Sequence, residues 1–401
     1  MIRKTLTVQL VVLCTFFQLA AFAQTGKIKF GQGLKVVAAD TSISLKFQFR
    51  MQHLFTAEQG LNDGDKFKSN YLVRRARIKF SGHVFNPKLT YKVELGISNR
   101  DISISSEDGN GGGASRIILD AVLKYNFVKS WTIWVGQTKL PGNRERVISS
   151  ADLQFVDRSM LNSKFNIDRD MGIQLHGKYK LGNSFTIKPK FAWTMGEGRN
   201  ITKGNFGGYN YTAHLDLLPM GEFEGKKDDY ISSDLNRQPK PKLSIGSTFN
   251  FNDDAVRQQG QLGSFVLVEN DSTGVYVTND LTSLMFDLMF KYKGLSIMSE
   301  YAMTSATDKI GGLSKNYNTG YGFNVQFAYL FTRNFEIAGR YTTLMPDDIN
   351  YSAVKETSEY TLALSKYIVG HNLKVQTDVA FIEEANSDGT MRFRFQVEMQ
   401  F

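Results

Sequence analysis

The chain has 401 residues, a formal net charge of +9 and a mean hydropathy of −0.27. Its single cysteine, Cys14, falls in the N-terminal apolar stretch, so the rest of the chain has no disulfide framework and no cysteine-based metal or nucleophilic site. After residue 23, no apolar run approaches the ~18 residues that a membrane-spanning helix requires. The chain is nevertheless rich in aromatics, with 30 Phe, 17 Tyr and 3 Trp. Such a composition is compatible with a transmembrane β-barrel, because lipid-facing and lumen-facing residues alternate there.

Residues 1–23 are predicted to be a secretory signal peptide, which leaves residues 24–401 as the mature domain. Arg3 and Lys4 give a short positive region, an apolar stretch follows, and the small residues that precede a cleavage site end at Ala23. The alternative is a retained membrane anchor, but the residues after Ala23 lack the flanking block of charges typical of such a helix. The signal peptide predicts export from the cytoplasm.

Alternation with a period of two runs through the mature chain. Residues 43–52, 89–98, 171–180 and 185–194 place apolar side chains at every second position and mainly polar or basic ones between them. This is the period of a β-strand with one apolar and one polar face. The strands of a soluble β-sandwich would also alternate. The lengths of the links between the strands therefore have to distinguish a sandwich from a membrane barrel.

Short links alternate with long polar links along the chain. The short links lie near residues 86–87, 128–129, 182–183, 293–294, 332–333 and 370–371, and the long ones near residues 58–68, 100–114, 139–166, 197–206, 253–280, 306–317, 345–353 and 384–389. Short turns at one end and long loops at the other are typical of outer-membrane barrels. We therefore predict an all-β fold, a closed transmembrane antiparallel β-barrel of about 16 strands. Residues 219–241 form a long link where a short turn is expected, so either this link is an excursion or the strand count is in error.

The last strand predicts the cellular location. Phe393, Phe395, Val397, Met399 and Phe401 share one face, and an aromatic residue is the last of the chain. Such a strand resembles the signal that the outer-membrane assembly machinery reads, and a soluble domain has no need of it. We expect a protein of the Gram-negative outer membrane, with membrane lipid and the assembly machinery as partners.

Four motifs of the mature chain resemble one known family. They are YLVRRARI (residues 71–78), DA (120–121), VGQTKLP (135–141) and DRDMGIQL (168–175), and together they resemble the phosphate-selective porin O and P family. The resemblance covers most of the mature chain and implies a sixteen-stranded barrel, usually a homotrimer. It also implies that the third external loop, residues 139–166 here, folds inward to narrow the pore. Channel-lining arginines and lysines would then pass small anions toward the constriction.

The charge pattern itself points inward. With Arg3 and Lys4 removed, the mature chain keeps an excess of +7. A Lys or Arg on the lipid face near the midplane would cost roughly 2 to 4 kcal/mol, so the basic members of the alternating faces should line the lumen. The strand residues assigned to the lumen are Lys46, Arg50, Arg75, Arg77, Lys79, Lys92, Lys124, Lys178, Lys180, Lys188, Lys190, Arg392 and Arg394, with Asp120, Glu94 and Glu398 as the acidic minority.

Arg74 departs from this pattern, because it shares a face with Leu72, Ile78 and Phe80. It either extends to the membrane interface or is turned inward by a β-bulge, and the family resemblance favours the bulge. We therefore add Arg74 to the candidate pore residues.

The expected inward loop is basic but not purely so. Its basic residues are Lys139, Arg144, Arg146, Arg158 and Lys164, and its acidic ones are Glu145, Asp152 and Asp157. The arginine forks suit phosphate. The link 253–280 has only Arg257 against five acidic residues, however, where family members with a phosphate site are richer in arginine. Phosphate selectivity is therefore less well supported than a preference for anions.

These observations predict a porin for passive diffusion of small hydrophilic solutes, preferring anions, with phosphate as a candidate solute. The five histidines show no metal-ligand spacing, and we expect no metal, no cofactor, no nucleic-acid partner and no enzymatic activity. One alternative is a channel specific for oligosaccharides or peptides, which Trp134 on a predicted lumen face would suit. A less favoured alternative is an outer-membrane lipase, for which no Ser, His and orienting acid or amide can be singled out.

The signal peptide makes a prediction about the mature protein. Its N-terminus should lie at or near Gln24, and the protein should fractionate with outer membranes. Intact-mass measurement of the protein purified from membranes tests both points. An intact Met1, or a soluble periplasmic form, would contradict the whole interpretation.

Overall fold

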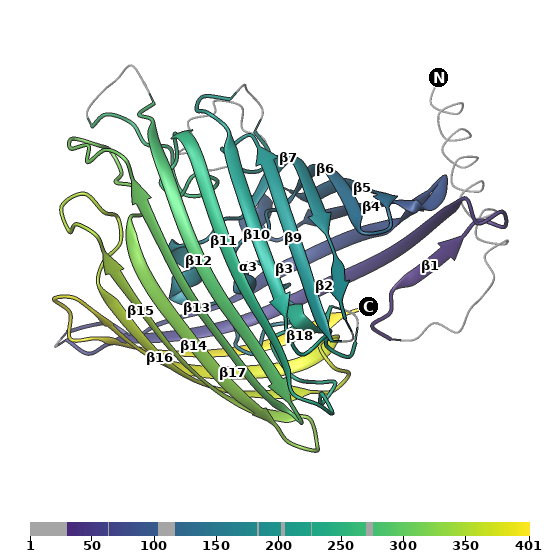
Figure 1. The fold of residues 1–401 in the computed structure, drawn as a ribbon. Coiled ribbons are helices and arrows are strands. Elements are labelled where there is room, and N and C mark those ends of the chain that lie inside the picture. The colour runs from purple at the N-terminus through teal and green to yellow at the C-terminus, as the bar shows by residue number, and fades with distance from the viewer. Residues whose placement is uncertain are drawn as a thin grey trace, which may run out of the picture.

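In the computed structural model, the chain folds into a single tilted β-barrel with two segments inside it (Figure 1). The structure describes residues 30–62, 64–102, 117–182, 184–201, 205–225, 227–269 and 276–401. The predicted signal peptide lies outside the described residues. Within them, no helix is long and apolar enough to cross a membrane.

The strands follow one another around the barrel in chain order. Their bounds are β1 (Leu34–Val37), β2 (Ile43–Gly60), β3 (Lys68–Val84), β4 (Asn86–Gly96), β5 (Ile118–Val128), β6 (Trp131–Lys139), β7 (Arg169–Gly177), β8 (Tyr179–Leu181), β9 (Phe185–Thr194), β10 (Asn210–Leu218), β11 (Lys242–Ala255), β12 (Asn279–Tyr292), β13 (Leu295–Ala306), β14 (Gly320–Leu330), β15 (Phe335–Pro346), β16 (Thr357–Tyr367), β17 (Leu373–Glu384) and β18 (Thr390–Gln400). The helices are short: α2 (Asn99–Ile102), α3 (Arg144–Val147), α4 (Met160–Lys164) and the 3-10 turn η3 (Asp228–Tyr230).

The barrel is closed by pairing of the last strand with β2. β18 pairs antiparallel with β2 from Gly60 to Arg50, and β1 pairs with β2 beyond that point. β7 and β8 both pair with β9, so they are two parts of one strand. The wall formed by the described residues therefore has 16 strands, as predicted. Closure leaves the wall without a free edge, which is what a sheet surrounded by lipid requires.

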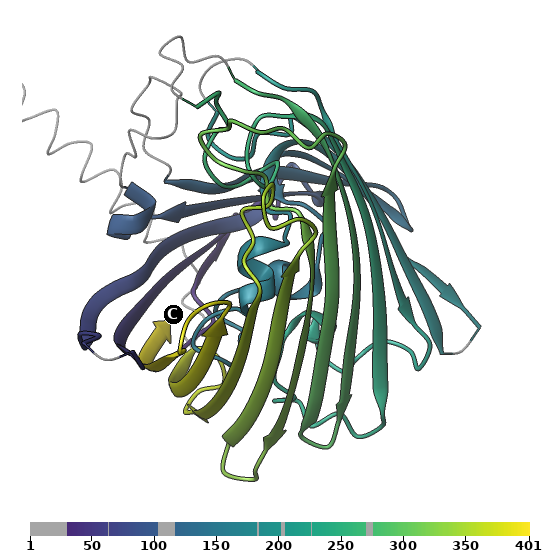
Figure 2. The ribbon, with the colours of Figure 1, turned by 90° about the vertical axis from the view of Figure 1, so that its left-hand side faces the viewer.

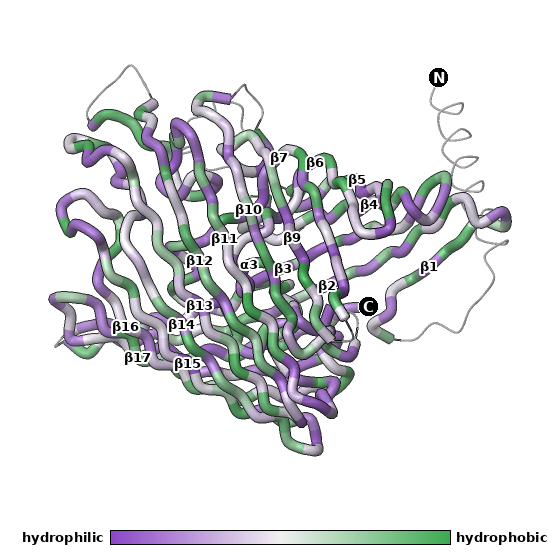
Figure 3. Tube along the Cα trace, in the orientation of Figure 1, coloured by the Kyte–Doolittle hydropathy of each residue, from purple (hydrophilic) through white to green (hydrophobic). Residues whose placement is uncertain are grey.

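The two faces of the wall differ as the alternation predicted. On β14, the inward Asn324 and Gln326 are buried, whereas the outward Phe323 and Phe327 are 38% and 61% exposed. Figure 3 shows apolar and polar residues alternating along the strands in this way. The outer surface can therefore face lipid while polar groups occupy the interior.

The links at the two ends of the barrel differ in length. We call the end with the tight connections, such as the one at Lys293 and Gly294, the short-turn end, and the opposite end the long-loop end. Residues 219–241 connect β10 to β11 at the short-turn end. The strand count is thus correct, and this link is an excursion, here called the 219–241 segment.

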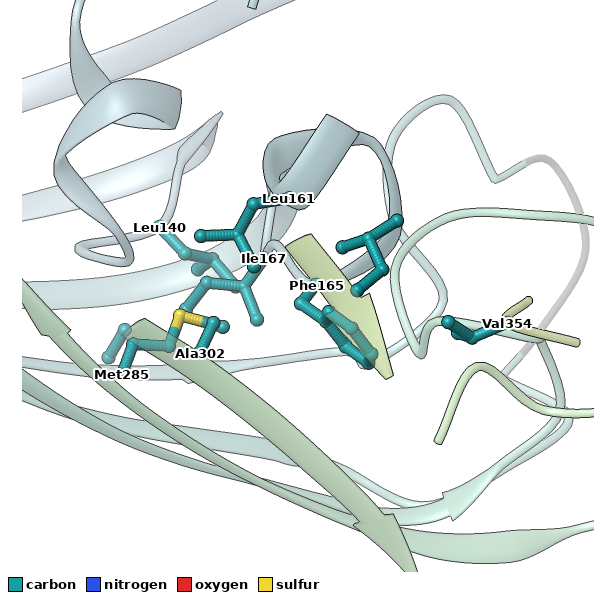
Figure 4. Packing of buried hydrophobic residues seen from close by; sticks show 9 residues of the cluster. Leu140, Leu161, Phe165, Ile167, Met285, Ala302 and Val354 are labelled. Carbon is teal, nitrogen blue, oxygen red and sulfur yellow. The ribbon is translucent and has the colours of Figure 1, made fainter. Parts of the chain in front are cut away.

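The loop between β6 and β7, residues 140–168 and here called L3, lies inside the barrel. Figure 2 shows its helical turns α3 and α4 within the ring of strands. Leu161 and Phe165 of L3 pack on inward Met285 and Ala302 (Figure 4), and Phe155 lies among small wall residues. Those small residues are Ala328, Ala338 and Ala363. One side of the interior, along β12–β16, is therefore filled by L3 and is not an open lumen.

The 219–241 segment also folds into the barrel, from the short-turn end. Asp228 forms an ion pair with Lys291 of β12 at 2.9 Å, and Asp234 accepts a hydrogen bond from Gly294 in the next turn at 2.7 Å. The backbone N–H of Ser232 donates to the carbonyl of Asp152 in L3 at 3.1 Å. The segment thus contacts L3 from the short-turn side and narrows the interior of the barrel at that end.

Candidate functional site

Arg144 attaches L3 to the wall. Its Nε donates to Asp287 of β12 at 2.6 Å, one Nη forms an ion pair with Asp216 of β10 at 3.1 Å, and the other donates to the carbonyl of Asp229 at 2.6 Å. The side chain of Arg144 is fully buried. A single guanidinium therefore joins L3, two wall strands and the 219–241 segment.

Further contacts continue this attachment around the same side of the barrel. The backbone N–H of Glu145 donates to Glu300 at 2.5 Å, and that of Val156 donates to Asp378 at 3.1 Å. Lys374 donates to the carbonyl of Leu153 at 3.0 Å. The acceptors Glu300 and Asp378 are wall carboxylates with exposures of only 1%, so L3 covers much of the acidic part of the wall.

The space that remains open lies mainly against β3–β9, with β16 and β18 also lining it at the long-loop end, where it begins. A cavity of about 660 Å³ there has ten arginines in its lining, and we call it the arginine cavity. Its acidic residues are four: Asp101, Asp157, Asp168 and Glu359. The arginines are Arg74, Arg75, Arg77, Arg146, Arg158, Arg169, Arg199, Arg257, Arg392 and Arg394.

A second cavity, of about 520 Å³, lies toward the short-turn end. It is lined by seven lysines, and we call it the lysine cavity. The lysines are Lys79, Lys92, Lys124, Lys139, Lys188, Lys190 and Lys227. Its acidic residues are Glu94, Asp120, Asp152 and Asp229.

Three cations line both cavities: Arg77, Lys139 and Arg169. They come from β3, β6 and β7, and we call this place the junction. Arg77 forms an ion pair with Glu94 at 3.0 Å, and Arg169 forms one with Asp120 at 3.1 Å. Lys139 has a different environment, because its ammonium donates to three backbone carbonyls of L3 at 2.7 to 3.1 Å.

Four lining cations have no carboxylate ion pair within the described part of the chain: Lys79, Lys124, Lys139 and Arg158. Arg158 donates to the carbonyls of Glu145 and Ile148. The Lys124 ammonium lies 3.3 Å from the centre of the Trp134 ring. Carbonyl dipoles and an aromatic face hold a cation in place without cancelling its net charge.

A β-bulge turns Arg74 inward. The pairing of β2 with β3 shifts between Gln52 and His53, and Arg74 is the residue left over. Arg74 and Arg75 both form ion pairs with Asp157 of L3, at 2.7 and 2.9 Å. Burial alone raises the pKa of Asp157, but the two arginines hold that pKa well below its usual range. Asp157 therefore remains charged, and the predicted inward position of Arg74 is the observed one.

Most of the candidate residues lie where the pattern placed them. Lys79, Lys92, Asp120, Lys124, Lys188 and Lys190 line the lysine cavity, Arg74, Arg75, Arg146 and Arg158 line the arginine cavity, and Arg77 and Lys139 line both. Lys178 and Lys180 lie near the short-turn rim, where they form ion pairs with Glu222.

Three candidates are corrected by the structure. Arg144 lines neither cavity, because its guanidinium is buried among carboxylates. Arg50 is also buried, with Glu398 at 2.5 Å and Ser150 of L3 at 2.9 Å. Lys46 is on the inward face but lines neither cavity. Alternation identifies the inward face, but it cannot show which part of that face L3 covers.

The sequence reasoning missed several lining residues. Arg169 stands in the DRDMGIQL motif, Arg257 in the acidic link, and Lys227 and Tyr230 in the 219–241 segment. For Arg169 a signal existed, since it lies just before a predicted strand and between two acidic residues. The others depend on how loops fold back into the barrel. Within the described ranges, no group of His, Cys, Asp and Glu could hold a metal ion.

The attachment of L3 predicts the effect of Arg144→Met. Removing one partner of a buried ion pair typically costs about 3 to 5 kcal/mol, because the remaining carboxylates stay buried and unpaired. We expect a lower free energy of unfolding in urea and, since L3 loosens, a larger and noisier single-channel conductance. Arg333→Met, which removes a charge from the exposed turn before β15, is the control. Equal stability and conductance in both variants would show that L3 does not depend on Arg144.

Comparisons with known proteins agree with the barrel geometry. An uncharacterized protein of Aquifex aeolicus (strain VF5) is 23% identical over 360 residues, which cover 85% of this chain and 82% of that protein. The loop L8 deletion mutant of OmpT, an outer membrane protein of Vibrio cholerae, superposes with a TM-score of 0.55 at 11% identity, over 90% of this chain and 100% of that chain. The outer membrane channel DcaP of Acinetobacter baumannii gives 0.54 at 11% identity, over 92% and 99%. At such identities these structures support the fold alone.

The family assignment rests on the sequence match. The model of the family described as phosphate-selective porin O and P matches residues 45–394, which include all four motifs quoted above. This match covers most of the chain and confirms the resemblance. The protein is therefore a member of the phosphate-selective porin O and P family.

Proposed function

We propose that this porin-family barrel is an outer-membrane diffusion channel that prefers small anions. The observation that supports the proposal most is the set of cations held by neutral partners, Lys124, Lys139 and Arg158, in or beside the junction. Their charges are not cancelled locally, so they remain available to a passing ion. In a narrow pore with low-dielectric walls, one dominant sign of charge concentrates the opposite ion.

The position of the acidic residues supports the same preference. Asp216, Asp287 and Glu300 have exposures of 5% or less, and they bind Arg144 or the backbone of L3. Six of the eight carboxylates that line the cavities, among them Glu94 and Asp120, are ion-paired with neighbouring cations. A permeating cation would therefore meet few unneutralised carboxylates along the open side of the barrel.

The two cavities differ in the kind of cation that they offer. Guanidinium groups present paired donors that match two oxygens of phosphate, whereas ammonium groups act as compact point charges. An anion would pass from arginines at the long-loop end, through the junction, to lysines at the short-turn end. Phosphate is then one permeant among small anions, and a strict phosphate selectivity goes beyond what this arrangement supports.

The same proposal includes the location and assembly of the protein. A signal peptide cleaved near Ala23 and the apolar C-terminal strand ending at Phe401 support insertion into the Gram-negative outer membrane by the assembly machinery. A homotrimer is expected, and in-vitro folded OmpT of Vibrio cholerae, described in a trimer form, has a similar fold with a TM-score of 0.52 at 11% identity, over 90% of this chain and 100% of that chain.

Two features speak against the alternative functions. His176 stacks on Trp134 with ring centres 3.9 Å apart, and Lys124 lies 3.3 Å from the same ring, so the two must cover opposite faces. No face of Trp134 is left for a sugar ring. For a lipase, Ser44 and His83 do lie 2.7 Å apart, but the other ring nitrogen faces the carbonyl of Thr41 and not an acid or amide side chain.

The proposal predicts the phenotype of the double variant Lys79→Gln, Lys124→Gln. Neither side chain has an ion-pair partner within the described ranges, so the barrel should assemble normally while the pore loses two unneutralised charges. We expect the chloride-to-potassium permeability ratio at 0.1 M salt to fall by roughly threefold or more. The difference should shrink at 1 M salt, where the Debye length is about 3 Å instead of about 10 Å.

Reversal potentials in planar bilayers under a salt gradient measure this ratio. Lys366→Gln makes the same type of substitution once, on the outward face of β16, and serves as the control. An unchanged ratio in a correctly assembled double variant, or an equal change in the control, would refute the anion preference as argued here.

A further inference from the structure

The lysine cavity combines cationic and apolar lining. Two of its cations, Lys79 and Lys124, have no ion-pair partner among the described residues, and they belong to the wall strands β3 and β5. Besides the charged Asp152, Lys227 and Asp229, the inserted segments contribute apolar groups, with Val147 from L3 and Ile231 from the 219–241 segment, both half-buried. The cations attract an anion. The apolar groups make no favourable contact with a fully hydrated inorganic ion.

The arginine cavity has fewer apolar groups in its lining. Its apolar lining residues are Leu119, Met160 and Leu262, among some twenty charged and polar ones. The lysine cavity has six apolar or aromatic lining residues in a smaller volume: Trp134, Leu140, Pro141, Val147, Tyr230 and Ile231. Its volume of about 520 Å³ lies within the range of small-molecule sites, about 300 to 1,000 Å³, and such sites combine apolar walls with a few placed polar groups.

We propose that the lysine cavity is a binding subsite for organic anions with a compact apolar body, such as an aryl phosphate monoester. The inference rests on the proposed anion channel and names a class of solute for it. The anionic group lies near Lys79 and Lys124, and the apolar body lies against Val147 and Ile231. The 219–241 segment is then a determinant of specificity as well as a support for L3.

The positions of the lysines decide where the anionic group binds. Lys188 and Lys190 also line the cavity, but Asp229 and Asp216 hold their ammonium groups at 2.5 and 2.7 Å. Among the described residues, the Lys124 ammonium is held by the face of Trp134 and by no carboxylate, so its charge is available to a ligand. Binding is expected to be weak, because a channel must release its solute, and an occupied subsite should obstruct the flow of chloride.

Current block in planar bilayers tests the subsite. Chloride current through the full-length protein is recorded at pH 8 while inorganic phosphate, methyl phosphate or phenyl phosphate is added, since all three are mainly doubly charged there. Phenyl phosphate should block at a concentration roughly tenfold lower than methyl phosphate, because an apolar group in a fitting pocket is worth roughly 10- to 200-fold in discrimination. Equal block by the two esters would overturn the proposal.

Variants then locate the effect. The double variant Val147→Thr, Ile231→Thr keeps branched side chains but adds hydroxyl groups, and it should reduce the advantage of phenyl phosphate to threefold or less. The ratio of the two blocking concentrations is the readout, since a general change in conductance cancels from it. Leu235→Thr, in the same segment but lining neither cavity, should leave that ratio as it is.

The outcomes separate the subsite from the channel. A full advantage of phenyl phosphate in the double variant would show that the apolar body binds elsewhere and would overturn the subsite. If the double variant does not assemble, the comparison of phenyl and methyl phosphate in the wild-type channel still tests the subsite. A wild-type channel with no preference for chloride over potassium would instead refute the anion channel on which the subsite rests.

Discussion

The buried guanidinium of Arg144 determines where this barrel is filled and where it is open. Its contacts with Asp216, Asp287 and the carbonyl of Asp229 place L3 against one side of the wall, and the 219–241 segment is held at the same point. Isolated buried charges are costly, so such a cluster persists only with its partners in place. Once L3 lies on that side, the path for solutes has to follow the other side.

This division also separates the charges. If positive and negative side chains were mixed evenly on the inward face of the barrel, their electric fields would largely cancel at a passing ion. Here many of the acidic residues bind Arg144, the backbone of L3 or neighbouring cations, whereas Lys124, Lys139 and Arg158 are held by an aromatic ring or by carbonyls. The modest charge excess of the sequence is thereby concentrated on the open side. Net charge alone would not have indicated this, since its effect depends on which charges are already neutralised.

Much of the fold could be predicted from the sequence, because alternation and link length follow from simple physical constraints. A lipid-facing strand must alternate, and a closed barrel has an even number of strands when both termini lie at one end. The bulge at Arg74 was one of two interpretations, since an unpaired register position leaves no trace in composition. The bounds of the open lumen could not be predicted, because they depend on tertiary contacts such as that of Phe155 with Ala328 and Ala338.

Alternation placed the basic residues on the inward face, but it could not show how L3 divides that face. Arg50 and Arg144 are buried against carboxylates and do not line the open space, and Arg169, which does line it, was overlooked.

The family match adds a constraint, but it does not replace the geometry. Members of one porin family share a barrel and an inward loop, while the solute depends on which side chains remain available at the narrowest part. In this chain Arg77 and Arg169 at the junction form ion pairs with carboxylates, so they attract an anion less strongly than unpaired arginines would. Among the described residues Lys139 has no carboxylate partner, and it lies where both cavities meet. Under the proposed function, the charge of Lys139 draws an anion into the junction, and the ion pairs of Arg77 and Arg169 keep these two residues from retaining it. Rapid diffusion through a selective pore requires this balance.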